Sequence, residues 1–563
     1  MEINYKKNLN PTLFNENNKN ILDLTEIQNY LPLYNNFFNL TPQNYSNFIL
    51  NYTLSLNSII SQDSYNKFSA SLINSHQEII QKDIFIKFSP LIDPIKYLSD
   101  KYDLSKNLMS LPILENNNQS LDKTYDLNNT AYIDGFFTFL TSKLLNDYNF
   151  IHGIDCYGNF LAVKSNFLAN IDEDIDFLFN CDAFHNNNNK LFKLTNNSHI
   201  EKLNFDTRNN KKKLIIEEEI NRIKETTLSN LNDIQKLNHA FTNSLQITDN
   251  EIDINKSLIF ECNLDNNSKK TNDSSSNCSS RTSNTNDSNS QSDHEEDSES
   301  GSSCSTASED EIMVTINNFP VNLIALECCT ATLDSYISNN ENIKDLEWDS
   351  IVIQILMMLI TYQKVFKMTH NDLHTNNIMY IHTEKKYLNY KFNNKHYKVP
   401  TFGKIYKIID FGRAIYSFKG KTMCSDSYHK DGDAATLYNF GTYKDPDKPT
   451  IEPNYSFDLA RLGCSIFDFF IEDLDDLDKI KSTIKKIILN WCNDDKDKNI
   501  LYKNNGQERY PDFKLYKMIA RTVHKHTPQN VLNNKYFEKY TVPKKNINKK
   551  SSIFNIDELP CLA

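Results

Sequence analysis

Two motifs decide the fold expected for this chain: His370-Asn371-Asp372-Leu373-His374-Thr375-Asn376-Asn377 and, further along, Asp410-Phe411-Gly412. Transfer of a phosphoryl group needs a carboxylate that orients the acceptor hydroxyl, and an Asn and an Asp that hold Mg²⁺ against the phosphates. The spacing puts Asp372 and Asn377 on one tight loop, and Gly412 allows a sharp turn after Asp410. The motifs therefore predict Asp372 as the catalytic base, with His370 and His374 beside it in the catalytic loop, and Asn377 and Asp410 as metal ligands.

The segments around these motifs follow the order that such a site requires. The expected elements are a buried helix at 346–368, strands at 376–381 and 404–409, a hairpin at 387–400 and a helix at 457–470. In this order the second of the two strands ends at Asp410. The alternative is that His370 and Asp372 cap a helix and that Asp410 starts a turn, but neither role calls for this arrangement.

Composition limits the class of protein. The chain has 563 residues and a net charge of -12, and its hydrophobic content of 39% indicates that part of it is not packed into a core. Residues 265–312 hold 11 acidic and 3 basic residues, so most of the net charge falls in a Ser-rich segment expected to be disordered. The 11 scattered cysteines include no CxxC pair and indicate reduced, intracellular thiols.

Targeting and partner signals are few. No secretory signal is evident, and the most apolar stretch, 351–362, is far shorter than the ~20 residues of a membrane span. Basic residues do not gather into a stripe, so direct nucleic-acid binding is not expected. The sequence does not indicate an oligomeric state.

The N-terminal half is harder to interpret. A strand is expected at 83–88, a helix at 131–147, and a pair of strands around Gly158 within 149–164. The first 75 residues remain unassigned. The 11 glycines include none before Gly135, although loops that cradle phosphates normally need glycine.

Three further stretches carry a resemblance. These are Leu326-Glu327-Cys328-Cys329, Thr332-Leu333-Asp334-Ser335-Tyr336, and Tyr455-Ser456-Phe457-Asp458-Leu459-Ala460-Arg461-Leu462-Gly463. With the two motifs they make residues 321–540 similar to the hinge and C-terminal lobe of eukaryotic-type protein kinases. The whole chain resembles the putative serine/threonine protein kinases of large nucleocytoplasmic DNA viruses, the giant viruses. The resemblance implies a bilobal α+β kinase fold, with a diverged, β-rich N-lobe and a mainly helical C-lobe.

The resemblance also implies roles for individual residues. Glu327 and Cys329 would bind adenine through their main chains, and Asp458 would brace the backbone of the catalytic loop. Ile84-Phe85-Ile86-Lys87 resembles the strand whose lysine contacts the ATP phosphates, and Asp134 would be the acid that pairs with it. Lys164 is a second candidate, but it falls after the helix at 131–147. ATP and Mg²⁺ are the implied cofactors.

Several positions depart from the family pattern. Asn371 replaces the usual arginine, so control by activation-loop phosphate is not expected. His374 replaces the usual lysine, which predicts a dependence on pH near the ordinary histidine pKa of ~6.5. No glycine-rich loop precedes Lys87, and no A-P-E sequence lies between Gly412 and Asp458.

The domain organisation and function follow from these features. We expect an N-terminal extension at 1–75, a diverged N-lobe at 76–264, a disordered acidic insert at 265–312, a hinge and C-lobe at 313–540, and a basic flexible tail at 541–563. The expected function is ATP-dependent phosphorylation of Ser or Thr in a protein substrate, away from membranes, inside the cell, either in host cytoplasm or in a virion. The alternatives are a small-molecule phosphotransferase of the aminoglycoside or choline kinase type, or a pseudokinase scaffold.

Overall fold

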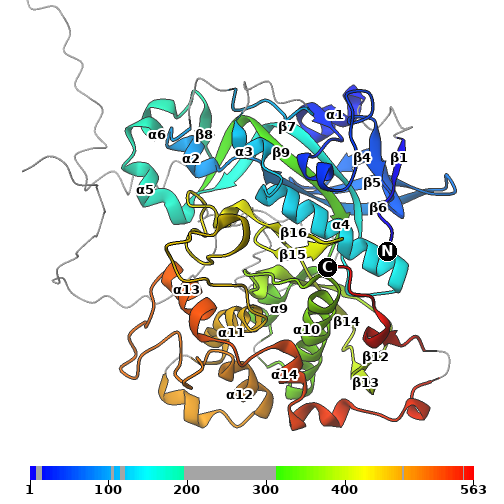
Figure 1. The fold of residues 1–563 in the computed structure, drawn as a ribbon, viewed down its shortest axis with the longest axis vertical. Coiled ribbons are helices and arrows are strands. Elements are labelled where there is room, and N and C mark those ends of the chain that lie inside the picture. Colours follow the sequence, from blue (N-terminus) through cyan, green and yellow to red (C-terminus); the bar gives the residue numbers. More distant parts are fainter. Residues whose placement is uncertain are drawn as a thin grey trace, which may run out of the picture. The chain divides into compact units, whose positions relative to one another are not determined.

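The computed structural model describes residues 1–7, 15–102, 107–114, 121–195, 312–340, 342–471, 474–548 and 551–563. The chain divides into two units, and all of these residues belong to the first, Met1–Asn209 with Cys278–Ala563. The acidic insert predicted at 265–312 lies outside the described residues, apart from Ile312. The first unit is α+β, as predicted, with one large sheet and a separate set of helices (Figure 1).

Seven strands of the described chain form an antiparallel sheet in the order β2-β7-β9-β6-β5-β4, with β8 added beside β9. These strands are β2 (Leu24–Gln28), β4 (Leu54–Gln62), β5 (Lys67–Asn74), β6 (Ile79–Pro90), β7 (Cys156–Asn170), β8 (Phe192–Leu194) and β9 (Met313–Glu327). Short helices precede or connect these strands: α1 (Glu16–Leu22) comes before β2, and α2 (Pro94–Leu98), α3 (Asp122–Tyr125), α5 (Ile175–Phe179) and α6 (Asp182–Asn187) lie between later strands in sequence.

The sheet differs from the sequence-based expectation in two ways. The boundary placed at residue 75 falls between β5 and β6, which pair along their length, so residues 54–74 are part of the sheet and not a separate extension. The pair of strands expected within 149–164 is instead one long strand, β7, because residues 149–155 turn between helix and sheet. Local propensity did not reveal either feature, since both depend on pairing between distant residues.

Helix α4 (Thr130–Tyr148) packs on one face of this sheet, and residues 131–144 are all buried. Two sheet side chains fasten it: Asn159 donates to the carbonyl of Gly135 (3.0 Å), and Asn322 donates to the carbonyl of Ala131 (2.8 Å). A Cβ added at Gly135 would lie 2.7 Å from both asparagine side chains. Glycine therefore allows the helix to approach the sheet this closely.

N-terminal residues cover another side of α4. Strands β1 (Tyr5–Lys7) and β3 (Phe48–Leu50) pair with each other, and the 3₁₀ helix η1 (Pro32–Asn36) lies between them in sequence. The Phe37 ring stacks on Phe136 of α4 with 5.0 Å between ring centroids, and Tyr52 meets Phe139 edge-on. Burial on all sides fixes the position of α4, which supplies part of the site described below.

The C-terminal part of the unit is mainly helical (Figure 1). Its helices are α9 (Leu333–Ser338), α10 (Asp345–Phe366), α11 (Phe457–Phe470), α12 (Thr483–Asn490), α13 (Phe513–Thr522) and α14 (Pro528–Leu532). Helix α10 is long and apolar enough to cross a membrane by length and composition, but 94% of its most apolar stretch is buried inside the protein. Its composition is accounted for by its place at the centre of the packed helices.

Small sheets complete this part. They contain β10 (Ala331–Thr332), β11 (Ile378–His382), β14 (Lys404–Ile408), the predicted hairpin β12 (Tyr387–Phe392) and β13 (Lys395–Pro400), β15 (Ile415–Phe418), β16 (Lys421–Cys424) and β17 (Phe554–Asn555). The flexible tail expected at 541–563 is not what the structure has. Strand β17 pairs with β12, Lys364 donates to the carbonyl of Ile556 (2.7 Å), and Ile556 is fully buried. Burial of apolar residues such as Ile556 therefore holds this segment against the protein, although a basic segment precedes it.

A buried histidine links the turn after α4 to the hairpin. The Nδ1 of His152 lies 2.7 Å from the carbonyl oxygen of Tyr406, and its Nε2 lies 2.7 Å from the hydroxyl of Tyr390. Burial lowers the pKa of His152 from 6.5 to about 4, so the imidazole is neutral, with Nδ1 donating and Nε2 accepting.

This histidine makes stability depend on pH. Because the pKa of His152 is lower in the folded state than in the unfolded state, its contribution to stability is complete above pH 6.5 and is lost as the pH falls towards about 4. Between about pH 7 and pH 5 the loss should be about 2 kcal/mol. Urea unfolding of the wild type and of His152→Gln at both pH values should show a weaker pH dependence in the variant. Equal pH dependence in both would contradict this account.

Candidate active site

The loop between α10 and β11, which contains Asp372 and Asn377, is held by hydrogen bonds to α11. Asp458, in the first turn of α11, is completely buried, and its carboxylate accepts the backbone N–H groups of His370 (3.0 Å) and Asn371 (2.8 Å). Burial raises the pKa of Asp458, while these N–H groups favour its charged form. The carboxylate thus holds the backbone of this loop at His370 and Asn371.

Hydrogen bonds join this loop to the segment that contains Asp410. The Nε2 of His370 donates to the carbonyl of Ile409 (2.9 Å), and the N–H of Ile409 donates to the carbonyl of Asn377 (3.0 Å). The amide of Asn377 in turn donates to the carbonyl of Asp372 (3.0 Å). Residues separated by up to 38 positions in sequence, Asp372, Asn377 and Asp410, therefore lie around one place in the fold.

The turn after β14 differs from the expectation for Gly412. The left-handed residue is Asp410 itself, with φ of 63°. Gly412 does not have a positive φ, and a Cβ added there would meet no atom closer than 3.5 Å. The sharp turn is therefore made by a strained aspartate, stabilised where the N–H of Phe411 donates to Asp134 (2.8 Å).

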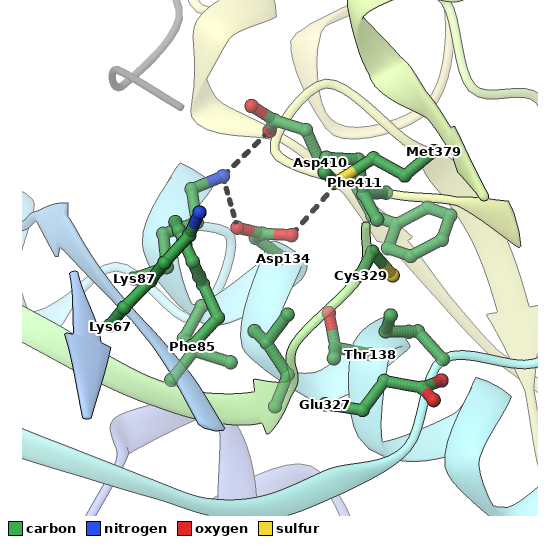
Figure 2. Close-up of a pocket in the computed structure, with 14 residues that line it drawn as sticks. Lys67, Phe85, Lys87, Asp134, Thr138, Glu327, Cys329, Met379, Asp410 and Phe411 are labelled. Carbon is green, nitrogen blue, oxygen red and sulfur yellow. Dashed lines mark hydrogen bonds and ion pairs between the residues drawn. The ribbon is translucent and has the colours of Figure 1, made fainter. Parts of the chain in front are cut away.

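A buried lysine connects the sheet, α4 and this turn. The Nζ of Lys87 on β6 lies 2.8 Å from a carboxylate oxygen of Asp134 and 2.9 Å from one of Asp410 (Figure 2). Burial alone would lower the pKa of Lys87, but attraction to the two carboxylates outweighs it and raises the pKa. Lys87 is therefore a permanent cation held between α4 and the Asp410 turn.

A pocket of about 630 Å³, its open mouth included, adjoins this lysine. Apolar side chains make most of its wall. Lys67, Lys87, Asp134 and Asp410 lie together at one end, and Glu327 lies apart from them (Figure 2). The lining residues are Lys67, Phe85, Lys87, Asp134, Thr138, Ile154, Ile324, Leu326, Glu327, Cys329, Met379, Ile409, Asp410 and Phe411.

The segment after β9 supplies the other end of the pocket. Glu327 and Cys329 both line it, where main-chain binding of adenine was expected. The side chain of Glu327 faces Lys407, which also donates to the carbonyl of Gly153 (2.6 Å), and its Oε1 accepts the N–H of Asp155 (3.0 Å). These contacts occupy one oxygen of the Glu327 carboxylate, and the N–H of Glu327 donates to the carbonyl of Asp155 (3.0 Å).

Asp410 and Asn377 are suited to bind Mg²⁺ when the phosphates of a nucleotide supply the remaining ligands. No cluster of three or more His, Cys, Asp or Glu occurs among the described residues, so an all-protein metal cage is not built there. Mg²⁺ is commonly held by one or two carboxylates, with substrate phosphates and waters completing its shell. Asp410 and Asn377 supply one carboxylate and one amide beside the pocket, which is the donor set that such binding needs.

The carboxylate of Asp372 is enclosed. It is 2% exposed, the hydroxyl of Tyr516 on α13 donates to its Oδ1 (3.0 Å), and the Nη1 of Arg413 lies 3.5 Å from its Oδ2. Arg461 on α11 donates to the Tyr516 hydroxyl (2.8 Å). The hydroxyl of Tyr516 therefore occupies one side of the Asp372 carboxylate.

Two departures from the family pattern have structural consequences. Asn371, at φ of 64°, donates to the carbonyl of Arg413 (3.0 Å) and accepts the hydroxyl of Tyr438 (2.7 Å), so it fastens the segment after Asp410 without a phosphate. His374 lies 3.0 Å from the amide of Asn377, and burial lowers its pKa to about 4. The expected titration of His374 near pH 6.5 is not supported, because the lowered pKa leaves this partly buried imidazole neutral at that pH.

Other predicted and unpredicted residues can now be placed. Lys164 lies on β7 away from the pocket and donates to the carbonyl of Leu22 (2.9 Å). The sequence interpretation missed Tyr516, Lys67 and Arg413. Of these three residues, only Arg413 could have been found from the sequence, because it directly follows Gly412. Tyr516 and Lys67 reach the site through helix packing and strand pairing, which no local sequence pattern reveals.

Comparison with known proteins adds no relative. A scan against protein-family models found no match, and a search of curated proteins found none either. Function is therefore inferred from the residues of the site.

Proposed function

We propose that this chain is an ATP-dependent protein kinase that transfers the γ-phosphate to serine or threonine hydroxyls. The observation that best supports this proposal is the pair of salt bridges from Lys87 to Asp134 and Asp410 in the pocket. A lysine on a sheet strand, paired with a helix acid and facing a metal-binding Asp, is the arrangement that positions ATP phosphates in protein kinases. On this proposal the sheet with α4 is the small lobe of a bilobal fold, and the helices form the large lobe.

The chain's residues then take defined roles. Lys87 binds the phosphates, Asn377 and Asp410 hold Mg²⁺, and Asp458 keeps the catalytic loop in place. When bound, Mg²⁺ would neutralise charge on the phosphates. Asp372 orients the acceptor hydroxyl and takes its proton. The apolar wall near Cys329 receives the adenine ring, consistent with the resemblance to the kinases of giant viruses.

One observation favours a second candidate. Because Tyr516 and Arg413 enclose the Asp372 carboxylate, the chain could bind ATP and use the bound state as a scaffold without transferring phosphate. We favour the enzyme, because Asp372, Asn377, Asp410 and Lys87 are all present, and the hydrogen bond to the Asp372 carboxylate comes from a tyrosine hydroxyl, which an acceptor hydroxyl can replace.

A transfer assay distinguishes the candidates. The full chain is incubated with Mg²⁺ and ATP labelled on the γ-phosphate, with casein or myelin basic protein as acceptor. Parallel samples contain amino-alcohols or aminoglycosides. Label on Ser or Thr of the protein acceptors supports the proposal. Label on the small acceptors alone would replace it with a small-molecule phosphotransferase, and Mg²⁺-dependent ATP binding without transfer would replace it with the scaffold.

A further inference from the structure

On the proposed function, the turn between β4 and β5 stands where kinases have a glycine-rich loop, but here three backbone N–H groups of the turn and its flank are used internally. The N–H groups of Asp63 and Ser64 both donate to the carbonyl of Lys67 (2.9 and 3.2 Å). The N–H of Lys67 donates to the Oγ of Ser64 (3.3 Å). Loops that bind phosphate through their backbone need such N–H groups to point at the ligand. These three N–H groups are therefore not available to bind phosphate.

The same turn is tied to neighbouring strands and does not fold over the pocket. The side-chain amide of Asn66 donates to the carbonyl of Ile86 (2.7 Å), and the N–H of Ile86 donates to the carbonyl of Asn66 (2.8 Å). The hydroxyl of Tyr65 accepts the N–H of Leu168 on β7 (3.0 Å). These bonds fix the turn, so recognition of phosphates must come from side chains at its base.

Strand register brings a lysine to that position. Lys67 is directly opposite Phe85 in the β5–β6 pair, and Phe85 and Lys87 lie two residues apart on β6. Side chains two residues apart on a strand share a face, and directly opposite residues share it as well. Lys67, Phe85 and Lys87 therefore project from one face of the sheet, and all three line the pocket (Figure 2).

The charge balance of the pocket favours a second cation there. Lys87 is shared between two carboxylates, Asp134 and Asp410, so this trio has a net negative charge. A triphosphate brings more negative charge than one Mg²⁺ neutralises. A further cation at the same end of the pocket would offset part of that repulsion, and the ammonium group of a lysine binds phosphate as a point charge.

We propose that Lys67 binds the phosphate chain of the nucleotide in place of the backbone amides of a glycine-rich loop. This inference rests on the proposed function and names how its nucleotide is recognised. The charge of Lys67, on the β4–β5 hairpin, then discriminates nucleoside triphosphates and diphosphates from nucleosides. The apolar pocket wall binds the base regardless of that charge.

Calorimetric titration of the full chain with Mg²⁺-ATP, Mg²⁺-ADP and adenosine tests this inference. Lys67→Met keeps the apolar stem and removes the charge, and it should weaken ATP and ADP binding about 10- to 100-fold. Adenosine binding should stay within about twofold of the wild type, and Lys67→Arg should restore most of the ATP affinity. The matched control is Lys82→Met, an exposed lysine of β6 that does not line the pocket, for which no change is expected.

The outcomes separate the two proposals. If the wild type binds neither ATP nor ADP, the proposed function fails and Lys67 has no nucleotide to recognise. If the wild type binds ATP and Lys67→Met binds it equally well, the proposed function stands and the role of Lys67 is wrong.

A second measurement does not need the variant to fold. Acetylation of wild-type lysines with an amine-reactive reagent, followed by mass spectrometry, should show that Mg²⁺-ATP protects Lys67 and leaves Lys82 reactive. Labelling of Lys67 that Mg²⁺-ATP does not change would overturn the inference.

Discussion

Replacement of Asp372 by Asn is expected to lower the turnover of phosphate transfer by about 100- to 10 000-fold. The amide has nearly the shape of the carboxylate and can still accept the hydroxyl of Tyr516, but it cannot take a proton from the acceptor. Asp372 does not line the pocket, so Mg²⁺-ATP affinity should be close to that of the wild type. Initial rates at saturating ATP, with binding measured separately, provide the test.

The control for this variant is Asp182→Asn, the same change at an exposed residue in the first turn of α6. Its rate should equal that of the wild type. A rate for Asp372→Asn within about threefold of the wild type would be incompatible with a general base at this position and would favour another acceptor geometry.

Replacement of Asp458 by Ala is expected to give the largest loss of stability, about 3 to 5 kcal/mol. Asp458 is fully buried, and its removal leaves the N–H groups of His370 and Asn371 without an acceptor and creates a cavity. Asp458→Asn keeps one carbonyl oxygen and should lose less. Urea unfolding curves of the wild type and these variants measure the difference in free energy of unfolding, provided that the dependence of this free energy on urea concentration is the same in each.

Asp468→Ala on the same helix is the control, because Asp468 is exposed there and should change stability by about 1 kcal/mol or less. If Asp458→Ala unfolds at nearly the wild-type urea concentration, the buried carboxylate is not what holds the catalytic loop. The assignment of Asp458 as the brace of that loop would then be wrong.

The sequence was most informative where chemistry is local. The five-residue step from Asp372 to Asn377 and the position of Asp410 at the end of a strand set their geometry almost without help from the rest of the chain. Lys87 could be chosen over Lys164 from the order of strand and helix, and the structure has Lys87 beside Asp134 and Lys164 far along β7.

The features that the sequence did not reveal depend on contacts between residues far apart in the chain. Strands β4 and β5 are rich in polar residues, and their membership of the sheet is decided by pairing with β6, which composition does not show. Tyr516 meets Asp372 across 144 residues, and only packing of α13 against α11 brings them together. The pKa of His374 likewise follows from burial, which its neighbours in sequence do not reveal.

A crystal structure of the chain with Mg²⁺ and a non-hydrolysable ATP analogue tests the central claim most directly. We predict the adenine ring against the wall near Cys329, phosphate oxygens in contact with Lys87, and Mg²⁺ held by Asn377 and Asp410. A nucleotide bound elsewhere, or one in the pocket whose phosphates point away from Asp410, would contradict the account.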